Sequence, residues 1–177
     1  MSIDKISAQI KTQGSKIPPV ELWDPEYCGE IDLQIKVNGD WFYNKTIFKR
    51  EALVKLLASV LKKEGDDYFL VTPVEKIKIT VEDAPFVLTQ WHWQDAKNEN
   101  MVVSTNLGDE FLLDNEHPML VSEHGELYVT VRRNLQAKVH RNVYYQWVDL
   151  AKEEVTKNST ELVFTSADCQ FSLGVID

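Results

Sequence analysis

The sequence predicts an α+β protein made of two related halves, each a hairpin, a helix and a second hairpin. Three observations support this fold class. Many short runs alternate apolar and polar residues, as half-buried strands do. Two longer runs place apolar residues every three or four positions, as amphipathic helices do. The halves also align with each other, because Arg50 can be placed on Arg141 with the following apolar stripes and hairpins in the same order.

The composition is that of a folded, acidic protein. The 177 residues include 28 Asp and Glu against 19 Lys and Arg, a net charge of −9, and five Trp, six Tyr and seven Phe supply apolar surface. A charge of this sign repels polyanions, so we expect no nucleic-acid partner. Neither a membrane span nor an apolar signal region is visible. The sequence therefore predicts no membrane association and a cytoplasmic location, with Cys28 and Cys169 as free thiols.

The first half is expected to be a polar arm over residues 1–16 followed by a domain over residues 17–82. In the arm, Ile3, Ile6 and Ile10 suggest a short amphipathic helix or a frayed end. Leucines spaced as on one helix face predict a helix over KREALVKLLASVLKKE, residues 49–64. The predicted strands flank this helix, and the first is followed by the Asn38–Gly39 turn signal: Ile31–Val37, Trp41–Tyr43, Tyr68–Thr72 and Ile77–Val81.

The second half, residues 83–177, is richer in strands. Six strand-like runs separated by turn residues come first: Phe86–Trp93, Met101–Thr105, Phe111–Leu113, Met119–Ser122, Leu127–Val131 and Leu135–Val139. A helix is predicted at about residues 142–154. Two closing strands are expected after it, Leu162–Thr165 and Phe171–Val175.

Arginine opens both predicted helices, and that position needs a compensating partner. A cation at the positive end of a helix dipole is disfavoured by a few tenths to about 1 kcal/mol. In the alignment of the halves, Glu75 falls on Asp168. We therefore predict ion pairs from Arg50 to Glu75 and from Arg141 to Asp168, each tying a helix to its second hairpin. The alternative is that both guanidinium groups are solvated.

The motifs of common enzyme and cofactor sites are missing. The seven glycines form neither G-x-G-x-x-G nor a Gly-Lys-Ser/Thr loop, and the four histidines share no metal-ligand spacing. No nucleophile stands beside a base. The sequence therefore predicts no catalytic residue, no metal and no cofactor, although His117 and His124 could meet across a hairpin to hold a metal ion.

Two clusters remain as candidate binding features. A basic run in this acidic chain is either a pocket for a small anion such as phosphate or a solvated strand face: Arg132, Arg133, Lys138, His140 and Arg141. The second cluster is Trp91–His92–Trp93. Its two indoles share one strand face and either stack on a planar ligand or, as the burial of Trp favours, belong to the core.

The run LVTPVEKIKITVEDAPF, Leu70–Phe86, resembles the signature of a bacterial family known as domain-of-unknown-function family 1285. Similar pieces flank it between about residues 18 and 155: Trp23–Pro25, Gly39–Trp41, Thr105–Asp109, His117–Pro118 and Arg133–Arg141. One departure is Asn44, where the family more often has Gly. The resemblance implies a duplicated α+β fold whose C-terminal half is similar to a pleckstrin-homology-like barrel capped by a helix. It also implies a cleft between the halves that binds a nucleotide-like ligand in signalling.

Polar residues near the expected junction of the halves fit such a ligand. Pro73 takes the chain out of the sheet, and Glu82–Pro85 form a charged turn. We expect a non-catalytic module that binds a small anionic, nucleotide-like ligand between the halves through seven residues: Thr72, Glu75, Lys76, Asp83, Asn106, Arg133 and Arg141. The junction residues could instead satisfy backbone groups of a tight crossover. A protein-interaction domain using the barrel face or a strand edge is the alternative function, and an enzyme is the third.

Overall fold

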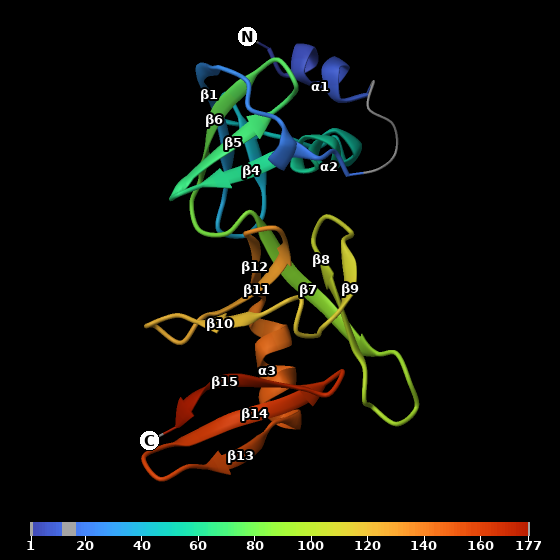
Figure 1. Ribbon diagram of the computed structural model, residues 1–177, viewed down its shortest axis with the longest axis vertical. Helices are drawn as coiled ribbons and strands as arrows, with labels where there is room; N and C mark the ends of the chain where they lie inside the picture. Colours follow the sequence, from blue (N-terminus) through green and yellow to red (C-terminus); the bar gives the residue numbers. More distant parts are fainter. Residues whose placement is uncertain (1, 12–16, 177) are drawn as a thin grey trace. The chain divides into compact units, whose positions relative to one another are not determined.

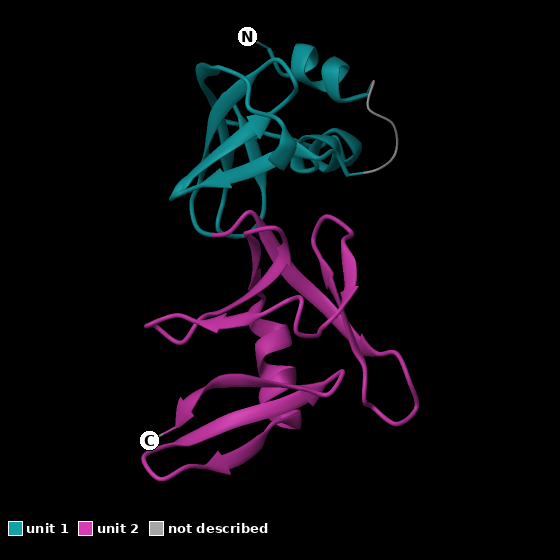
Figure 2. Ribbon diagram, viewed as in Figure 1, with its two compact units in different colours: residues 1–83 teal, residues 84–177 magenta. Residues whose placement is uncertain are grey.

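The computed structural model describes residues 2–11 and 17–176 (Figure 1). The chain divides into two compact units, residues 1–83 and residues 84–177 (Figure 2). Each unit has its own six-stranded sheet and its own apolar core. Over the described residues, no helix has the length and apolar character that crossing a membrane requires.

Unit 1 is one sheet with two helices, α1 (Ile3–Lys11) and α2 (Glu51–Ala58), and a short 3-10 turn at Val20–Leu22. The strand order is β3-β2-β1-β6-β5-β4, and β1 and β6 pair in parallel at the centre. The strands are β1 (Tyr27–Ile35), β2 (Trp41–Tyr43), β3 (Thr46–Ile47), β4 (Leu61–Glu64), β5 (Asp67–Val71) and β6 (Lys76–Val81).

The core of unit 1 lies between the sheet and the two helices. Alternate residues of β1 and β6, among them Leu33 and Ile77, are buried, and α2 adds Leu57. The expected amphipathic helix in the arm is confirmed, because α1 buries Ile6 and Ile10 and packs against α2.

The helix predicted over residues 49–64 is wrong in its second half. The structure ends α2 at Ala58 and uses Leu61–Glu64 as β4, which pairs with β5 across a turn at Gly65 (φ +59°). Leu61 is buried opposite Leu70 of β5. The cross-strand pairing therefore outweighs the helical preference of the lysines, as tertiary contacts commonly do.

Unit 2 repeats the six-stranded plan and adds one helix and a third sheet. The strand order of its large sheet is β10-β11-β12-β7-β8-β9. The strands are β7 (Phe86–Trp93), β8 (Met101–Thr105), β9 (Glu110–Leu112), β10 (Met119–Val121), β11 (Leu127–Arg132) and β12 (Leu135–Val139). Helix α3 (Arg141–Leu150) follows, and then a sheet of β13 (Lys152–Val155), β14 (Thr160–Ser166) and β15 (Cys169–Ile176). The predicted helix extended to residue 154, but residues 152–155 pair with β14 instead.

The two halves are related, as predicted, and the strand order shows how. In each large sheet the first strand pairs antiparallel with the second and parallel with the sixth, so β1 corresponds to β7 and β6 to β12. The alignment of Arg50 with Arg141 does not follow this equivalence. Helix α2 lies between the third and fourth strands of its unit, whereas α3 comes after the sixth. An apolar helical stripe can be superposed on any other, so it did not fix the register of the repeat.

Candidate functional site

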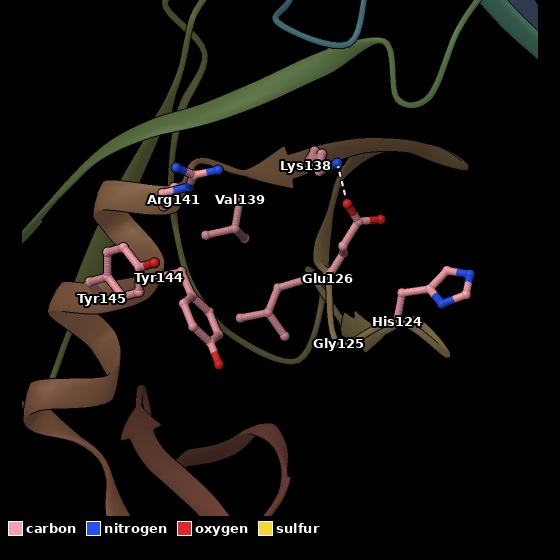
Figure 3. A pocket seen from close by; sticks show the side chains of 9 residues that line it. His124, Gly125, Glu126, Lys138, Val139, Arg141, Tyr144 and Tyr145 are labelled. Atoms are coloured by element: carbon pink, nitrogen blue, oxygen red, sulfur yellow. Dashed lines mark hydrogen bonds and ion pairs between the residues drawn. The ribbon is translucent and has the colours of Figure 1, made fainter.

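A pocket of about 470 Å³ in unit 2 gathers cationic and aromatic side chains (Figure 3). It is lined by the β10–β11 turn, by β11 and β12, and by the first turns of α3: His124, Gly125, Glu126, Leu127, Lys138, Val139, Arg141, Tyr144 and Tyr145. In the close-up, Arg141 and the two tyrosines lie on the α3 side, and Glu126 and His124 lie on the hairpin side. Two members of the predicted basic run, Lys138 and Arg141, therefore line the same pocket.

Arg141 reaches this pocket because it is the first residue of α3. His140 precedes it in extended conformation, and the Nδ1 atom of His140 accepts a hydrogen bond from the Asn142 backbone N–H at 3.2 Å, which caps the helix. The first turn contains no acidic residue. The cationic side chain and the positive end of the helix dipole therefore act together, and both favour an anion.

The predicted ion pair between Arg141 and Asp168 is wrong. Asp168 lies exposed in the β14–β15 turn with a φ of +59°. Within residues 2–11 and 17–176, Arg141 forms no ion pair, and its side chain lines the pocket instead. Since a solvated arginine at a helix start is disfavoured by the dipole, this side chain is available to an incoming anion.

The predicted pair between Arg50 and Glu75 is wrong for a different reason. Arg50 is exposed at the start of α2, while the Glu75 carboxylate is met by α1. Lys5 Nζ lies 3.5 Å from Glu75 Oε1, and Gln9 Nε2 donates to Oε2 at 3.2 Å. The sequence offered no way to place the arm helix beside this carboxylate.

Lys138 already has an anionic partner inside the pocket. Its Nζ atom lies 2.6 Å from Glu126 Oε1, and the Tyr128 hydroxyl donates to Glu126 Oε2 at 3.2 Å. Both members of the ion pair are partly exposed, at 23% for the Lys138 side chain and 43% for Glu126. Solvent and dissolved anions can therefore reach the pair.

Tyr144 and Tyr145 give the pocket an aromatic wall. Their ring centroids are 5.8 Å apart with the ring planes at 62°, and Tyr145 is 57% exposed. The sequence analysis missed both residues as candidates. The spacing of Tyr144 fits the apolar stripe of a helix, and no local pattern marks its exposed neighbour Tyr145 as a binding residue.

In unit 1, Thr72 and Glu75 hold the β5–β6 turn together. The Thr72 hydroxyl accepts the Glu75 N–H at 3.0 Å, and the Thr72 N–H donates to the Glu75 carbonyl at 2.8 Å. Thr72 is 1% exposed. These contacts correspond to the structural alternative, in which junction residues satisfy the backbone of a tight crossover.

Lys76 is half-buried at the start of β6 in the unit 1 sheet. It pairs with Glu64, which holds the pKa of that carboxyl below its usual value, and its Nζ lies 4.6 Å from the centre of the Phe69 ring. A shallow pocket of about 280 Å³ surrounds it. Asp83, the last residue of unit 1, is half-buried, and its charge adds to the effect of burial in raising the pKa of Tyr68.

Asn106 and Arg133 occupy turns of the unit 2 sheet. The Asn106 side-chain oxygen accepts the Val87 N–H at 3.0 Å, and the Asn106 N–H donates to the Val87 carbonyl at 2.8 Å, so the residue extends the β7 hydrogen bonding. Arg133 sits in the β11–β12 turn with a φ of +53°. Of the seven predicted site residues, Arg141 alone lines the 470 Å³ pocket.

Asn106→Ala is expected to lower the free energy of unfolding by about 1–3 kcal/mol, because the backbone N–H of the buried residue Val87 loses its hydrogen-bond acceptor. Urea denaturation monitored by circular dichroism measures this change. Asn158→Ala, an exposed substitution in the turn between β13 and β14, provides the comparison. An Asn106→Ala protein as stable as the Asn158→Ala protein would contradict the structural role.

The Trp91 and Trp93 rings share one face of β7, as predicted. They meet edge to face with centroids 5.7 Å apart, and the Trp91 indole N–H donates to Gln146 Oε1 at 2.7 Å. Both residues are half-buried, and Trp93 lines a second pocket of about 450 Å³ beside β14.

Among the described residues, no group of three or more His, Cys, Asp or Glu side chains is placed to hold a metal ion.

Comparisons with known proteins agree with the predicted resemblance. The family model for the N-terminal domain of DUF1285, a domain of unknown function, matches residues 18–84, and the model for the C-terminal domain matches residues 85–173. Among curated proteins, none matches the chain.

Two crystal structures of DUF1285 family proteins are similar to this chain. The protein from Silicibacter pomeroyi DSS-3 is 34% identical with a TM-score of 0.81, covering 97% of this chain and 95% of that chain. The protein from Shewanella baltica OS155 is 32% identical with a TM-score of 0.55, covering 66% of this chain and 90% of that chain.

Proposed function

The chain belongs to the DUF1285 family, and from its geometry we propose that it binds a small anionic ligand in the unit 2 pocket, as a non-catalytic module in signalling. The observation that carries this proposal is Arg141. It is a cation at a helix start, without an ion-pair partner in the described part of the chain, and it lines a 470 Å³ pocket.

The charge around Arg141 supports an anion rather than a neutral ligand. Lys138 lines the same pocket, although the protein as a whole carries a net charge of −9. A local positive group in a negative protein attracts small anions while the overall field repels long polyanions. Arginine also holds phosphate oxygens through two parallel hydrogen bonds, which suits phosphate esters.

The tyrosines support a ligand with a flat ring, such as a nucleotide. Tyr144 and Tyr145 both lie about one helical turn after Arg141 on α3, and both line the pocket. A base stacked on such a ring contributes about 1–3 kcal/mol in single-stranded nucleic-acid binding sites. A phosphate on Arg141 with a base against the tyrosines would use both parts of the pocket.

Arg141→Ala is expected to weaken binding of the best nucleotide or phosphate ester at least tenfold, because a hydrogen bond to a charged group contributes about 1.5–3 kcal/mol. Wild-type and variant proteins are titrated calorimetrically with ligands chosen from a thermal-shift panel of nucleotides and inorganic anions. At a hundredfold excess over the dissociation constant, the wild type gains about 2.7 kcal/mol of stability.

Arg50→Ala is the matched control, since Arg50 is likewise an exposed arginine at a helix start but lies outside the pocket. Equal weakening by both substitutions would point to net charge rather than to this site. A panel that stabilises nothing would refute the proposal, and turnover of a panel member would refute its non-catalytic part.

The remaining residues predicted from sequence stay a proposal for ligand binding within their own units: Thr72, Glu75, Lys76 and Asp83 in unit 1, and Asn106 and Arg133 in unit 2. Lys76 is the one cation among the predicted site residues of unit 1, and Lys76→Ala tests whether it binds the ligand. If the ligand requires it, the variant loses the thermal shift while keeping its fold. If only Arg141→Ala loses the shift, the ligand is held by the unit 2 pocket alone.

A protein-interaction role is favoured by one observation on β13. All four residues of this strand are exposed, Val155 is 76% exposed, and β13 is at one end of the order of its three-stranded sheet. Such an edge can accept a partner strand. Strand addition would protect the backbone amides of residues 152–155 from hydrogen exchange when the partner binds.

A further inference from the structure

We infer that Glu126 acts as a resident competitor for anions in the unit 2 pocket, so that a ligand reaches Lys138 only by displacing the Glu126 carboxylate. The inference rests on the proposed function of that pocket. Glu126 lines it together with Arg141 and occupies Lys138 through the 2.6 Å ion pair. A ligand anion and the Glu126 carboxylate therefore compete for one lysine.

The backbone of Glu126 is fixed, so the competitor stays at the pocket. Its N–H donates to Ser122 Oγ at 3.0 Å, and its carbonyl accepts the Ser122 N–H at 2.8 Å, which closes the β10–β11 hairpin. The Tyr128 hydroxyl on β11 holds the second carboxylate oxygen at 3.2 Å. Displacing the carboxylate from Lys138 therefore moves a side chain and leaves the hairpin in place.

This arrangement makes the two cations of the pocket unequal. Arg141 has no carboxylate partner among the described residues, so a single anionic group binds there without displacing anything. An anion on Lys138 gains one charge-assisted hydrogen bond and breaks another, so the net gain is small. Meanwhile Glu126 repels every anion in the pocket through Coulomb interaction.

A ligand with a second anionic group can use both cations of the pocket. One group binds Arg141, and the other replaces Glu126 on Lys138. Diphosphates have two anionic groups, whereas phosphate monoesters and simple carboxylates have one. The ligand class that uses both cations is therefore a diphosphate or another compound with two anionic groups.

Glu126→Gln is expected to bind inorganic pyrophosphate about five- to tenfold more tightly than the wild type, because one repelling charge at short range is removed and the ligand no longer has to displace a carboxylate from Lys138. The same substitution should strengthen acetate binding by a smaller factor, because the repulsion grows with the charge of the anion and acetate binds Arg141 without needing Lys138. The preference for pyrophosphate over acetate should therefore widen. Isothermal titration with both probes at fixed ionic strength measures the two factors, and thermal unfolding checks that the variant is folded.

Glu51→Gln is the matched control. Glu51 forms a comparable pair with Lys55 at 2.9 Å on α2, so the substitution changes net charge equally without touching the pocket. Lys138→Ala should weaken pyrophosphate binding in the wild-type background and reduce the gain in the Glu126→Gln background to the part that comes from the removed repulsion.

The outcomes separate the two claims. Tighter binding by Glu126→Gln but not by Glu51→Gln supports the competitor. Unchanged or weaker binding by Glu126→Gln, with Arg141→Ala still defective, overturns the competitor and leaves the anion site standing. Absence of binding in the wild type and in both glutamine variants overturns the proposed function and the inference with it.

Discussion

Trp147→Ala is expected to lower the free energy of unfolding of unit 2 by about 3–5 kcal/mol, the cost of replacing a large buried aromatic side chain by alanine. Trp147 is fully buried on α3, and its ring lies 5.1 Å from that of Phe164. Phe164 in turn stacks on Phe171 at 5.6 Å, so the three rings join α3 to β14 and β15. The alanine variant leaves a cavity in the middle of this contact.

Trp147→Phe is the informative second variant. In the part of the chain that the structure describes, the Trp147 indole N–H has no hydrogen-bond partner, so phenylalanine removes no hydrogen bond. We expect it to cost less than half as much as alanine. Guanidinium denaturation of both variants measures the difference, with Tyr145→Ala, an exposed residue of the same helix, as the baseline. Equal losses for Trp147→Ala and Tyr145→Ala would contradict the packing described for α3.

Asp109→Ala is expected to cost about 2–3 kcal/mol, because it leaves the Arg132 guanidinium partly buried without this carboxylate. Arg132 Nη1 lies 2.5 Å from Asp109 Oδ1, and the two side chains are 15% and 24% exposed. The guanidinium also lies 4.9 Å from the centre of the Phe86 ring, and Thr105 donates to Asp109 Oδ2 at 3.1 Å. One carboxylate therefore joins β8 and β11.

Asp114→Ala is the comparison for Asp109→Ala, since Asp114 accepts one turn N–H and forms no ion pair in the described structure. Thermal unfolding at neutral pH in low and high salt separates the ion pair from the turn contacts. Only the stability loss caused by Asp109→Ala should decrease at high salt. The decrease should be modest, because the ion pair is partly buried. Matching losses in both variants would exclude a special role for the Arg132 pair.

The local pattern of apolar residues was sufficient to predict most strands and the arm helix, but not to predict where helices end. The run after Ala58 carries helix-forming lysines, yet Leu61–Glu64 become β4 because β5 offers a partner strand. The same happens at residues 152–155, where β14 is the partner. In both places the backbone pairing with a neighbouring strand across a turn determines the structure. Helix propensity describes a single segment and does not include this pairing.

The site was predictable only in part, for a similar reason. The basic run pointed to Arg141 and Lys138, which do line one pocket, but it did not separate them from Arg132, which is paired with Asp109. Glu126 and the two tyrosines come from a turn and a helix that only the folded sheet brings together. Thr72 and Asn106 have the chemistry of ligand groups, but in the structure they bond to nearby backbone.

The parallel pairs at the centre of both large sheets have a consequence for synthesis on the ribosome. In unit 1 the pair joins β1 to β6, the first strand made to the last, and in unit 2 it joins β7 to β12. Neither sheet can close until its final strand has left the exit tunnel. The nascent chain thus holds an unfinished sheet with an open central edge for most of each unit's translation, the period in which holding by chaperones matters most.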